Sequence, residues 1–192
     1  MDELIFFSQN NNKTKEVCGF LNLKNTKILT LNDFPQIDSP KETGKTFQEN
    51  AIIKSIYGYK KFKIPCVADD SGICIEALNS GPGINSKRFI LENGGIEKTI
   101  KIIIEKVKSK KNYKAFFQTS LALTNKKGET VCFDGIKSGR ITNKPLGING
   151  FGYDPVFIPE GSNLTYAQMD FDKKNKISHR YIAFKKLINF LN

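Results

Sequence analysis

Two adjacent carboxylates, Asp69 and Asp70, follow an apolar run at residues 64–68 and precede Ser71 and Gly72. We expect the apolar run to be a buried strand that ends at the acidic pair, because ligands of open α/β sheets bind beyond the carboxyl ends of strands. Neighbouring carboxylates are costly to place there without a cation, and oxygen ligands suit Mg²⁺. The competing interpretation is an Asp-Ser-Gly turn that merely ends the strand.

A second candidate site is the polar loop at residues 8–12, which separates a predicted strand at residues 4–7 from a predicted helix. Lys13 falls at the start of that helix, where unpaired backbone N–H groups and the helix dipole favour an anion such as phosphate. The alternative is a helix capped by Asn11 or Asn12, with Lys13 in solvent.

Other candidate residues lie outside these two segments. Glu42 is a third acid that would complete a metal site with Asp70, although alone it would be an ordinary surface carboxylate. His179 and Arg180 lie at or near the start of the last predicted helix, with Lys174 about one turn before Ser178. Neighbours on a helix point in different directions, so both reach one ligand only if the helix end borders it. A partly exposed surface histidine is the alternative.

Periodicity predicts the elements that must position these residues. A capping-box pattern at residues 46–49 begins a helix that continues through residue 59, and isoleucines at helical spacing predict another at residues 96–107. Segments 115–123 and 130–133 flank a turn at 125–128 and predict a hairpin, and residues 156–158 predict a short strand. The last helix is expected to bury one face, which comprises Ile177, Tyr181, Phe184, Ile188 and Leu191.

Length and composition limit the alternatives. The 192 residues fit a single domain, 1–192, and no apolar run approaches the length of a membrane span. The four cysteines are scattered, which fits reduced thiols in a cytoplasmic protein. The net charge of +11 comes almost wholly from lysine and forms no aromatic-interleaved stripe, so we expect no specific nucleic-acid binding. Residues 44–46 lack the upstream glycine and the strand of a phosphate loop, and no Gly-x-Ser-x-Gly elbow indicates a serine hydrolase.

Taken together, the motifs resemble those of the inosine triphosphate pyrophosphatase family over nearly the whole chain. The matching segments are 8–13 with Glu16, 46–51 with Lys54, 68–72, Pro82-Gly83, 150–155 and 177–180. One departure is Asn79-Ser80, where many members have two glycines. The resemblance implies an α/β fold, with an elongated twisted mixed sheet, flanking helices and two lobes around a central nucleotide-binding cleft. It also implies a homodimer and Mg²⁺ as cofactor, for which Mn²⁺ can substitute.

The implied activity is hydrolysis of non-canonical purine nucleoside triphosphates (ITP, dITP and XTP) to the monophosphate and pyrophosphate. By similarity, Glu42 and Asp70 hold the metal, and Asp70 also acts on the attacking water. The residues implied to bind the triphosphate are Ser8, Gln9, Asn10, Asn11, Asn12, Lys13 and Lys54, while Ser71 and Lys87 also contact substrate. The residues implied to line the sugar and base site are Phe151, Gly152, Tyr153, Asp154, Lys174, His179 and Arg180.

Hydrogen-bond chemistry supports the implied base preference. Arg180 can only donate, so it suits the 6-oxo acceptor of hypoxanthine or xanthine and opposes the amino group of adenine. Two alternatives remain open. One is a related pyrophosphatase with another base preference, and the other is a non-catalytic nucleotide- or RNA-binding protein, which the positive charge motivates.

Overall fold

The computed structural model describes residues 3–23 and 25–192. The chain divides into two compact units: unit 1 comprises residues 1–70, 119–135 and 180–192, and unit 2 comprises residues 71–118 and 136–179. Three strands contribute residues to both units, namely β3 (Cys66–Ile75), β5 (Lys114–Thr124) and β6 (Thr130–Ile141). Within the described residues no helix is long and apolar enough to cross a membrane.

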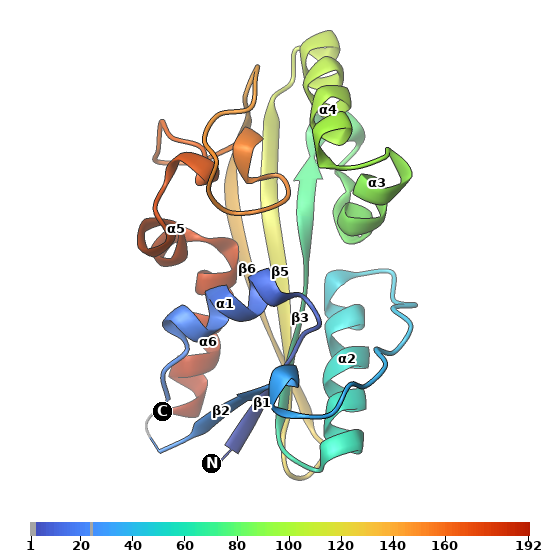
Figure 1. The fold of residues 1–192 in the computed structure, drawn as a ribbon, viewed down its shortest axis with the longest axis vertical. Helices are drawn as coiled ribbons and strands as arrows, with labels where there is room; N and C mark the ends of the chain where they lie inside the picture. The colour runs from blue at the N-terminus through green and yellow to red at the C-terminus, as the bar shows by residue number, and fades with distance from the viewer. Residues whose placement is uncertain (1–2, 24) are drawn as a thin grey trace. The chain divides into compact units, whose positions relative to one another are not determined.

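Unit 1 is built on β1 (Glu3–Phe7), which pairs in parallel with β2 (Lys27–Thr30) on one side and with β3 on the other. The strand order in this unit is β2-β1-β3-β5-β6. Three helices flank these strands: α1 (Asn11–Phe20), α2 (Phe47–Phe62) and α6 (His179–Leu191), as Figure 1 shows.

The alternation of side chains along β1 divides unit 1 into two apolar layers. Leu4 and Phe6 pack in a cluster with residues of α1 and α6, and Phe6 meets Phe184 edge to face at 5.7 Å between ring centroids. Ile5 and Phe7 belong to a cluster on the α2 side of the strand. Successive residues of a strand point to opposite faces, so one strand serves both layers. Neighbouring β3 follows the same rule, which determines where its acids point.

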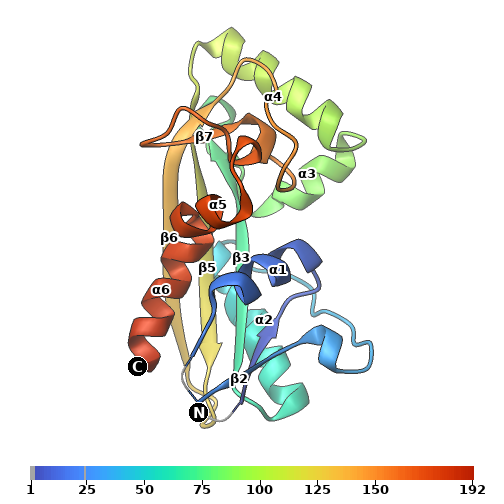
Figure 2. The ribbon, with the colours of Figure 1, turned by 60° about the vertical axis from the view of Figure 1, so that its left-hand side comes forward.

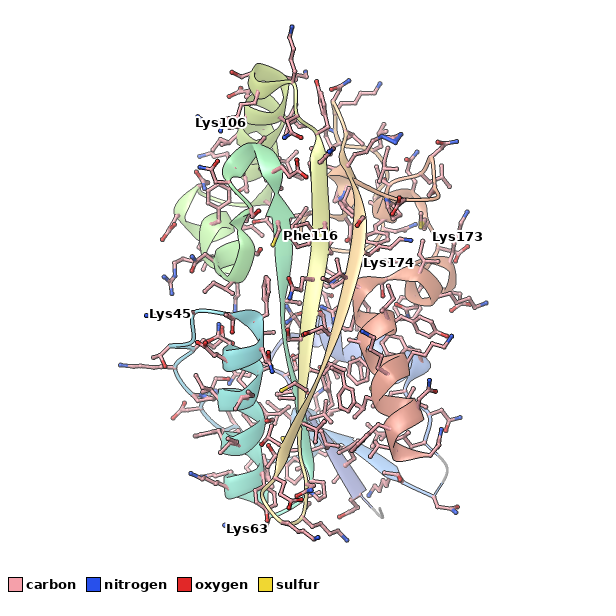
Figure 3. The ribbon with its side chains drawn as sticks, turned by 180° about the vertical axis from the view of Figure 1, so that it is seen from behind. Lys45, Lys63, Lys106, Phe116, Lys173 and Lys174 are labelled. Atoms are coloured by element: carbon pink, nitrogen blue, oxygen red, sulfur yellow. The ribbon has the colours of Figure 1, made fainter. Side chains whose placement is uncertain are left out.

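Helix α2 carries an acidic residue in its first turn and basic residues in its last turn. Glu49 lies in its first turn, whereas Lys60 and Lys61 lie in its last turn, an arrangement that the helix dipole favours. Figure 3 shows Lys45 at the amino-terminal end of this helix and Lys63 at its carboxyl-terminal end. The Thr46 side chain accepts a hydrogen bond from the Glu49 N–H, so half of the predicted capping box is present. The Glu49 carboxylate accepts from the Lys45 N–H instead, at 2.7 Å.

Unit 2 has its own apolar core under α3 (Ser86–Glu92) and α4 (Ile96–Lys110), which pack against each other (Figure 2). In this unit β4 (Gly81–Pro82) pairs antiparallel with β3, and β7 (Phe157–Pro159) pairs antiparallel with β6. The shorter elements are α5 (Phe171–Ile177) and 3₁₀ turns at Glu76–Leu78, Gly83–Asn85, Asp154–Val156 and Tyr166–Gln168; a further turn, Leu31–Asp33, belongs to unit 1.

The mixed sheet with flanking helices confirms the predicted α/β class, and the helix at 96–107 and the hairpin around 125–128 are confirmed as α4 and β5–β6. The predicted start of the last helix is wrong. The last helix begins only at His179, because Ser178 has extended backbone that separates it from α5, and Ile177 packs in the core of unit 2. Helix α3 was not predicted from the sequence.

Candidate active-site residues

The acidic pair lies in the middle of β3 and not at its end, so the predicted strand end is wrong. The strand continues for five residues beyond Asp70, because its distal part pairs with β4 and the Ile73 N–H donates to Ser86 Oγ at 3.0 Å. Gly72 lacks a side chain where a Cβ would lie 2.2 Å from the Gly83 carbonyl oxygen. Close packing against residues 83–86 therefore explains the Ser-Gly dipeptide better than a turn does.

Asp69 points to the layer that contains α1 and α6, where cations from both helices meet it. Lys13 Nζ lies 3.0 Å from Asp69 Oδ2, and Arg180 Nε donates to the same oxygen at 3.4 Å. Burial alone would raise the pKa of Asp69, but the nearby cations, Lys13 and Arg180 foremost, hold that pKa well below its ordinary value of 3.8. Asp69 is therefore an ionised structural anion that orients two cations.

Arg180 is buried, with a side chain only 2% exposed. Besides its bond to Asp69, its Nη1 pairs with Glu16 Oε2. Burial lowers the pKa of a guanidinium, but these two carboxylates more than offset that effect and raise it. The Glu16–Arg180 pair joins α1 to α6, whose residues are 164 positions apart in the chain. Hydrogen bonding of Arg180 to a purine base stays a prediction, because the described contacts of Arg180 are with the carboxylates of Asp69 and Glu16.

Asp70 points to the opposite layer, where α2 supplies its partners. Asn50 Nδ2 donates to Asp70 Oδ2 at 3.1 Å, and Lys54 Nζ lies 3.4 Å from Asp70 Oδ1. Burial raises the pKa of Asp70 above 3.8, and the Lys54 and Lys13 cations offset only part of that effect. A carboxylate with a raised pKa is a better proton acceptor than an ordinary aspartate.

Glu42 and Asp70 share one cation, the Lys54 ammonium. Lys54 Nζ lies 2.7 Å from Glu42 Oε1, and the side chain is nearly buried. Burial would lower the pKa of Lys54, but Asp70, Asp69 and Glu42 together raise it. The two carboxylates predicted to hold a metal are thus already arranged around a positive charge, which fits a divalent cation with oxygen ligands. Among the described residues no group of three acidic, histidine or cysteine side chains is arranged for a metal.

The polar loop that follows β1 provides the N-cap of helix α1. The N-cap of α1 is Asn10, and not Asn11 or Asn12, because its Oδ1 accepts from the N–H groups of Asn12 and Lys13 at 3.0 and 3.2 Å. Ser8 Oγ accepts from the Asn10 N–H at 3.3 Å, which holds the loop in place. Gln9, Asn11 and Asn12 are exposed. Lys13 is the residue of this loop whose cation reaches the acidic strand.

In unit 2, several predicted sugar- and base-site residues meet in one polar cluster. Lys174 Nζ lies 2.5 Å from Asp154 Oδ2, and it lies over the ring of Phe151 at 4.7 Å from the centroid. Asp154 Oδ2 also accepts from the Phe151 N–H at 2.8 Å, which closes the loop. Gly150 is required there, because a Cβ on it would lie 2.1 Å from that same oxygen.

The remaining predicted residues of unit 2 have separate surroundings. The His179 ring stacks on Phe117 at 4.7 Å between centroids, and the side chain is buried. The Tyr153 hydroxyl donates to the Ser86 carbonyl at 2.7 Å, and burial raises its pKa. Ser71 is half-buried, whereas Lys87 is exposed on α3. Gly152 has a positive φ of 59° and open space beside it.

Glu16 and Asn50 lie near the acidic strand, but neither residue received a role from the sequence alone. Both are buried polar residues, and a buried polar side chain usually has a specific hydrogen-bond or charge partner. A pocket of about 430 Å³ in unit 2 contains none of the predicted residues; it is lined mainly by residues of β5, β6 and β7, including Lys114, Phe116 and Arg140. Figure 3 shows Phe116 on β5.

Comparisons with known proteins agree with the motifs. The sequence profile of the Ham1 family matches residues 4–190. A dITP/XTP pyrophosphatase of Halalkalibacterium halodurans is 38% identical over 194 residues, covering all of both chains, and one of Christiangramia forsetii is 37% identical over 190 residues and 99% of each. A solved HAM1 protein from Coxiella burnetii superposes with a TM-score of 0.87 at 35% identity, covering 100% of this chain and 98% of that one. The Staphylococcus aureus Ham1 protein gives 0.85 at 35% identity, covering 98% and 97%. The chain therefore belongs to the Ham1 family.

Proposed function

We propose that this protein hydrolyses the non-canonical purine nucleoside triphosphates ITP, dITP and XTP to the monophosphate and pyrophosphate, and so removes them from the nucleotide pool. The observation that carries the proposal is the pair Glu42 and Asp70, which converge on one buried cation beside α2. The full-length similarity to proteins named dITP/XTP pyrophosphatase supports the same assignment.

Glu42 and Asp70 are proposed to hold Mg²⁺, for which Mn²⁺ can substitute. Two carboxylates suffice, because Mg²⁺ usually keeps waters and substrate phosphates in its coordination shell. When bound, the metal neutralises charge on the phosphates and makes a water more acidic. Both carboxylates are held in place by residues of α2, so the protein supplies a prepared oxygen pair.

The chain's own residues then divide the work on the triphosphate. Asp70 takes the proton of the attacking water as a general base. Lys13 and Lys54 face the developing negative charge on the phosphates, which lowers the barrier electrostatically. The ion pair with Asp69 holds the Lys13 ammonium in place. The Ser8 to Asn12 loop supplies the remaining polar groups toward the phosphates.

Base selection is proposed to depend on whether the group at position 6 of the purine accepts or donates a hydrogen bond. Lys174 and Arg180 can only donate, so they favour a 6-oxo purine and leave the adenine amino group without an acceptor. Buried donors left unpaired cost roughly 1 to 3 kcal/mol each, enough for discrimination on the order of a hundredfold. Residues 151–154 with His179, Ser71 and Lys87 are proposed to complete the contacts to the nucleoside.

A substrate panel tests the proposal. Pyrophosphate release is measured with Mg²⁺ for ITP, dITP, XTP, GTP, ATP and dUTP at equal concentration. We expect the highest kcat/KM for the first three and little turnover of ATP. A maximum at GTP or dUTP would support the related pyrophosphatase with another base preference. No turnover, together with strong salt-sensitive binding of RNA, would support the non-catalytic alternative.

We further propose that the 192 residues act as a single domain, since β3, β5 and β6 are common to both units. The family resemblance also leads us to propose a cytoplasmic homodimer without specific nucleic-acid partners. Light scattering coupled to size exclusion tests the dimer against the chain mass of 21.6 kDa. A mass that stays at the monomer value across concentrations would contradict it.

A further inference from the structure

The side-chain amide of Asn50 joins the two segments that carry Glu42 and Asp70. Its Nδ2 donates to Asp70 Oδ2 at 3.1 Å, while its Oδ1 accepts from the backbone N–H of Gly44 at 2.8 Å. Gly44 lies two residues after Glu42 in the same loop. Asn50 is only 3% exposed, so water does not compete for either bond. One buried amide therefore ties the Glu42 loop to the acidic strand.

The chemistry of its partners fixes the orientation of this amide. The Gly44 N–H can only donate, so the Asn50 oxygen must face it, and the NH₂ group then faces the carboxylate. This donor occupies Asp70 Oδ2 and leaves Oδ1 toward the Lys54 ammonium. Asn50 thereby sets the rotation of the Asp70 carboxylate as well as its distance from the loop.

The loop is shaped to reach this amide. A Cβ on Gly44 would lie 2.7 Å from Asn50 Oδ1 and 2.6 Å from Glu49 Cβ, so a larger residue would push the loop away from α2. The Lys45 N–H bond to Glu49 adds a second tie between the loop and the first turn of α2. Neither tie involves a residue that is proposed to touch the nucleotide.

We propose that Asn50 is a positioning residue that sets the spacing and orientation of Glu42 and Asp70 for the divalent cation. The proposal rests on the metal role that the proposed function gives to those two acids. Outer partners of metal ligands orient the ligands, and their loss typically weakens metal affinity by about 10- to 100-fold. Asn50 acts through Asp70 and through Gly44, without contacting the metal itself.

The test measures binding of Mn²⁺ alone, without nucleotide, by calorimetric titration of the full chain. Asn50→Ala is expected to weaken Mn²⁺ binding by about tenfold or more, and Gly44→Ala to weaken it in the same direction, because each breaks one end of the tie. Thr46→Ala is the matched control. It removes the N-cap bond to Glu49 at the same helix start, so it should lower stability and leave Mn²⁺ affinity within about twofold.

Circular dichroism confirms that each variant is folded at the temperature of the titration. Should Asn50→Ala fail to fold, Gly44→Ala carries the test, because it leaves the Asn50 bond to Asp70 in place. Wild-type Mn²⁺ affinity in the folded variants, with Glu42→Gln and Asp70→Asn impaired, would overturn the positioning role and leave the proposed function standing. Wild-type Mn²⁺ affinity in Glu42→Gln and Asp70→Asn as well would instead remove the proposed metal ligands.

Discussion

Asp69 and Asp70 are neighbours in β3, yet their carboxylates lie on opposite faces of the strand and have different partners. Asp69 meets Lys13 and Arg180, whereas Asp70 meets Asn50 and Lys54. As a consequence, the pKa values of the two acids shift in opposite directions: the pKa of Asp69 is lowered, and the pKa of Asp70 is raised. The two acids should therefore respond differently to substitution.

Asp70→Asn is expected to lower kcat for ITP by about 10²-fold or more, because an amide neither accepts the proton of the water nor binds a metal well. The free energy of unfolding at neutral pH should change little, because two effects oppose each other. Burial raises the pKa of Asp70, so ionised Asp70 lowers that free energy as the pH rises, but the substitution also removes one of the two carboxylates that contact Lys54. Denaturant titration at neutral pH checks that the variant is folded, and near-normal turnover would contradict the mechanism.

Asp69→Asn is expected to lower the free energy of unfolding at neutral pH by about 3 kcal/mol, because it removes the carboxylate that contacts Lys13 and one of the two carboxylates that contact buried Arg180. The pKa of Asp69 in the folded chain lies below its ordinary value of 3.8 owing to Lys13, Arg180 and Lys54. Its contribution is therefore present above pH 3.8 and is lost as the pH falls below that value. Unfolding measured against pH should show the wild type and the variant converging in acid; a constant gap would refute this origin.

Lys13→Ala is expected to raise KM for ITP and to lower kcat, each by about tenfold, since a cation on the triphosphate matters more as charge develops in the transition state. Lys15→Ala is the control, because Lys15 is an exposed lysine of the same helix. Steady-state kinetics of both variants at one ionic strength give the comparison. Equal effects of the two substitutions would indicate a general field effect of positive charge.

Arg180→Ala is expected to lower the free energy of unfolding by about 3 to 5 kcal/mol, because it removes the guanidinium that pairs with buried Glu16 and leaves Asp69 with Lys13 but without Arg180. Arg140→Ala, at an exposed arginine, should change it little. Below the unfolding temperature, kcat/KM should fall more for ITP and XTP than for ATP if the guanidinium also donates to the base. Equal losses for ITP and ATP would assign selection to residues 151–154.

Ser80→Gly is expected to raise the free energy of unfolding by about 1 kcal/mol, because Ser80 has a left-handed φ of 63° that glycine adopts without strain. Ser80 is one of the two residues that replace a glycine pair common in the family. Ser80→Ala is the control, since it removes the same hydroxyl but keeps the Cβ. Thermal unfolding of both variants distinguishes backbone strain from loss of a side-chain contact.

Local sequence patterns predicted the elements whose periodicity is strong. The isoleucines of α4 and the turn before Gly128 needed no tertiary information. The course of β3 past Asp70 did need it, because pairing with β4 and packing against Gly83 override the local turn signal of Ser71-Gly72. Such contacts come from residues that the sequence does not mark as partners.

The candidate site shows the same division. Local sequence signals pointed to Asp70 after an apolar run and to Lys13 at a helix start, and the family resemblance added Lys54. The pairing of Arg180 with Asp69 spans 111 positions, and its pairing with Glu16 spans 164. Only the folded chain reveals that these charges neutralise one another.

Lys54 serves as a built-in counter-ion for Glu42 and Asp70. In the proposed function, Glu42 and Asp70 would exchange this ammonium for a divalent cation, and the phosphate oxygens of a nucleotide would offer the ammonium a new partner. Binding of nucleotide and binding of metal would then be thermodynamically linked, because each would remove a cost that opposes the other. In the protein alone, one ammonium partly offsets the charge of the two acids.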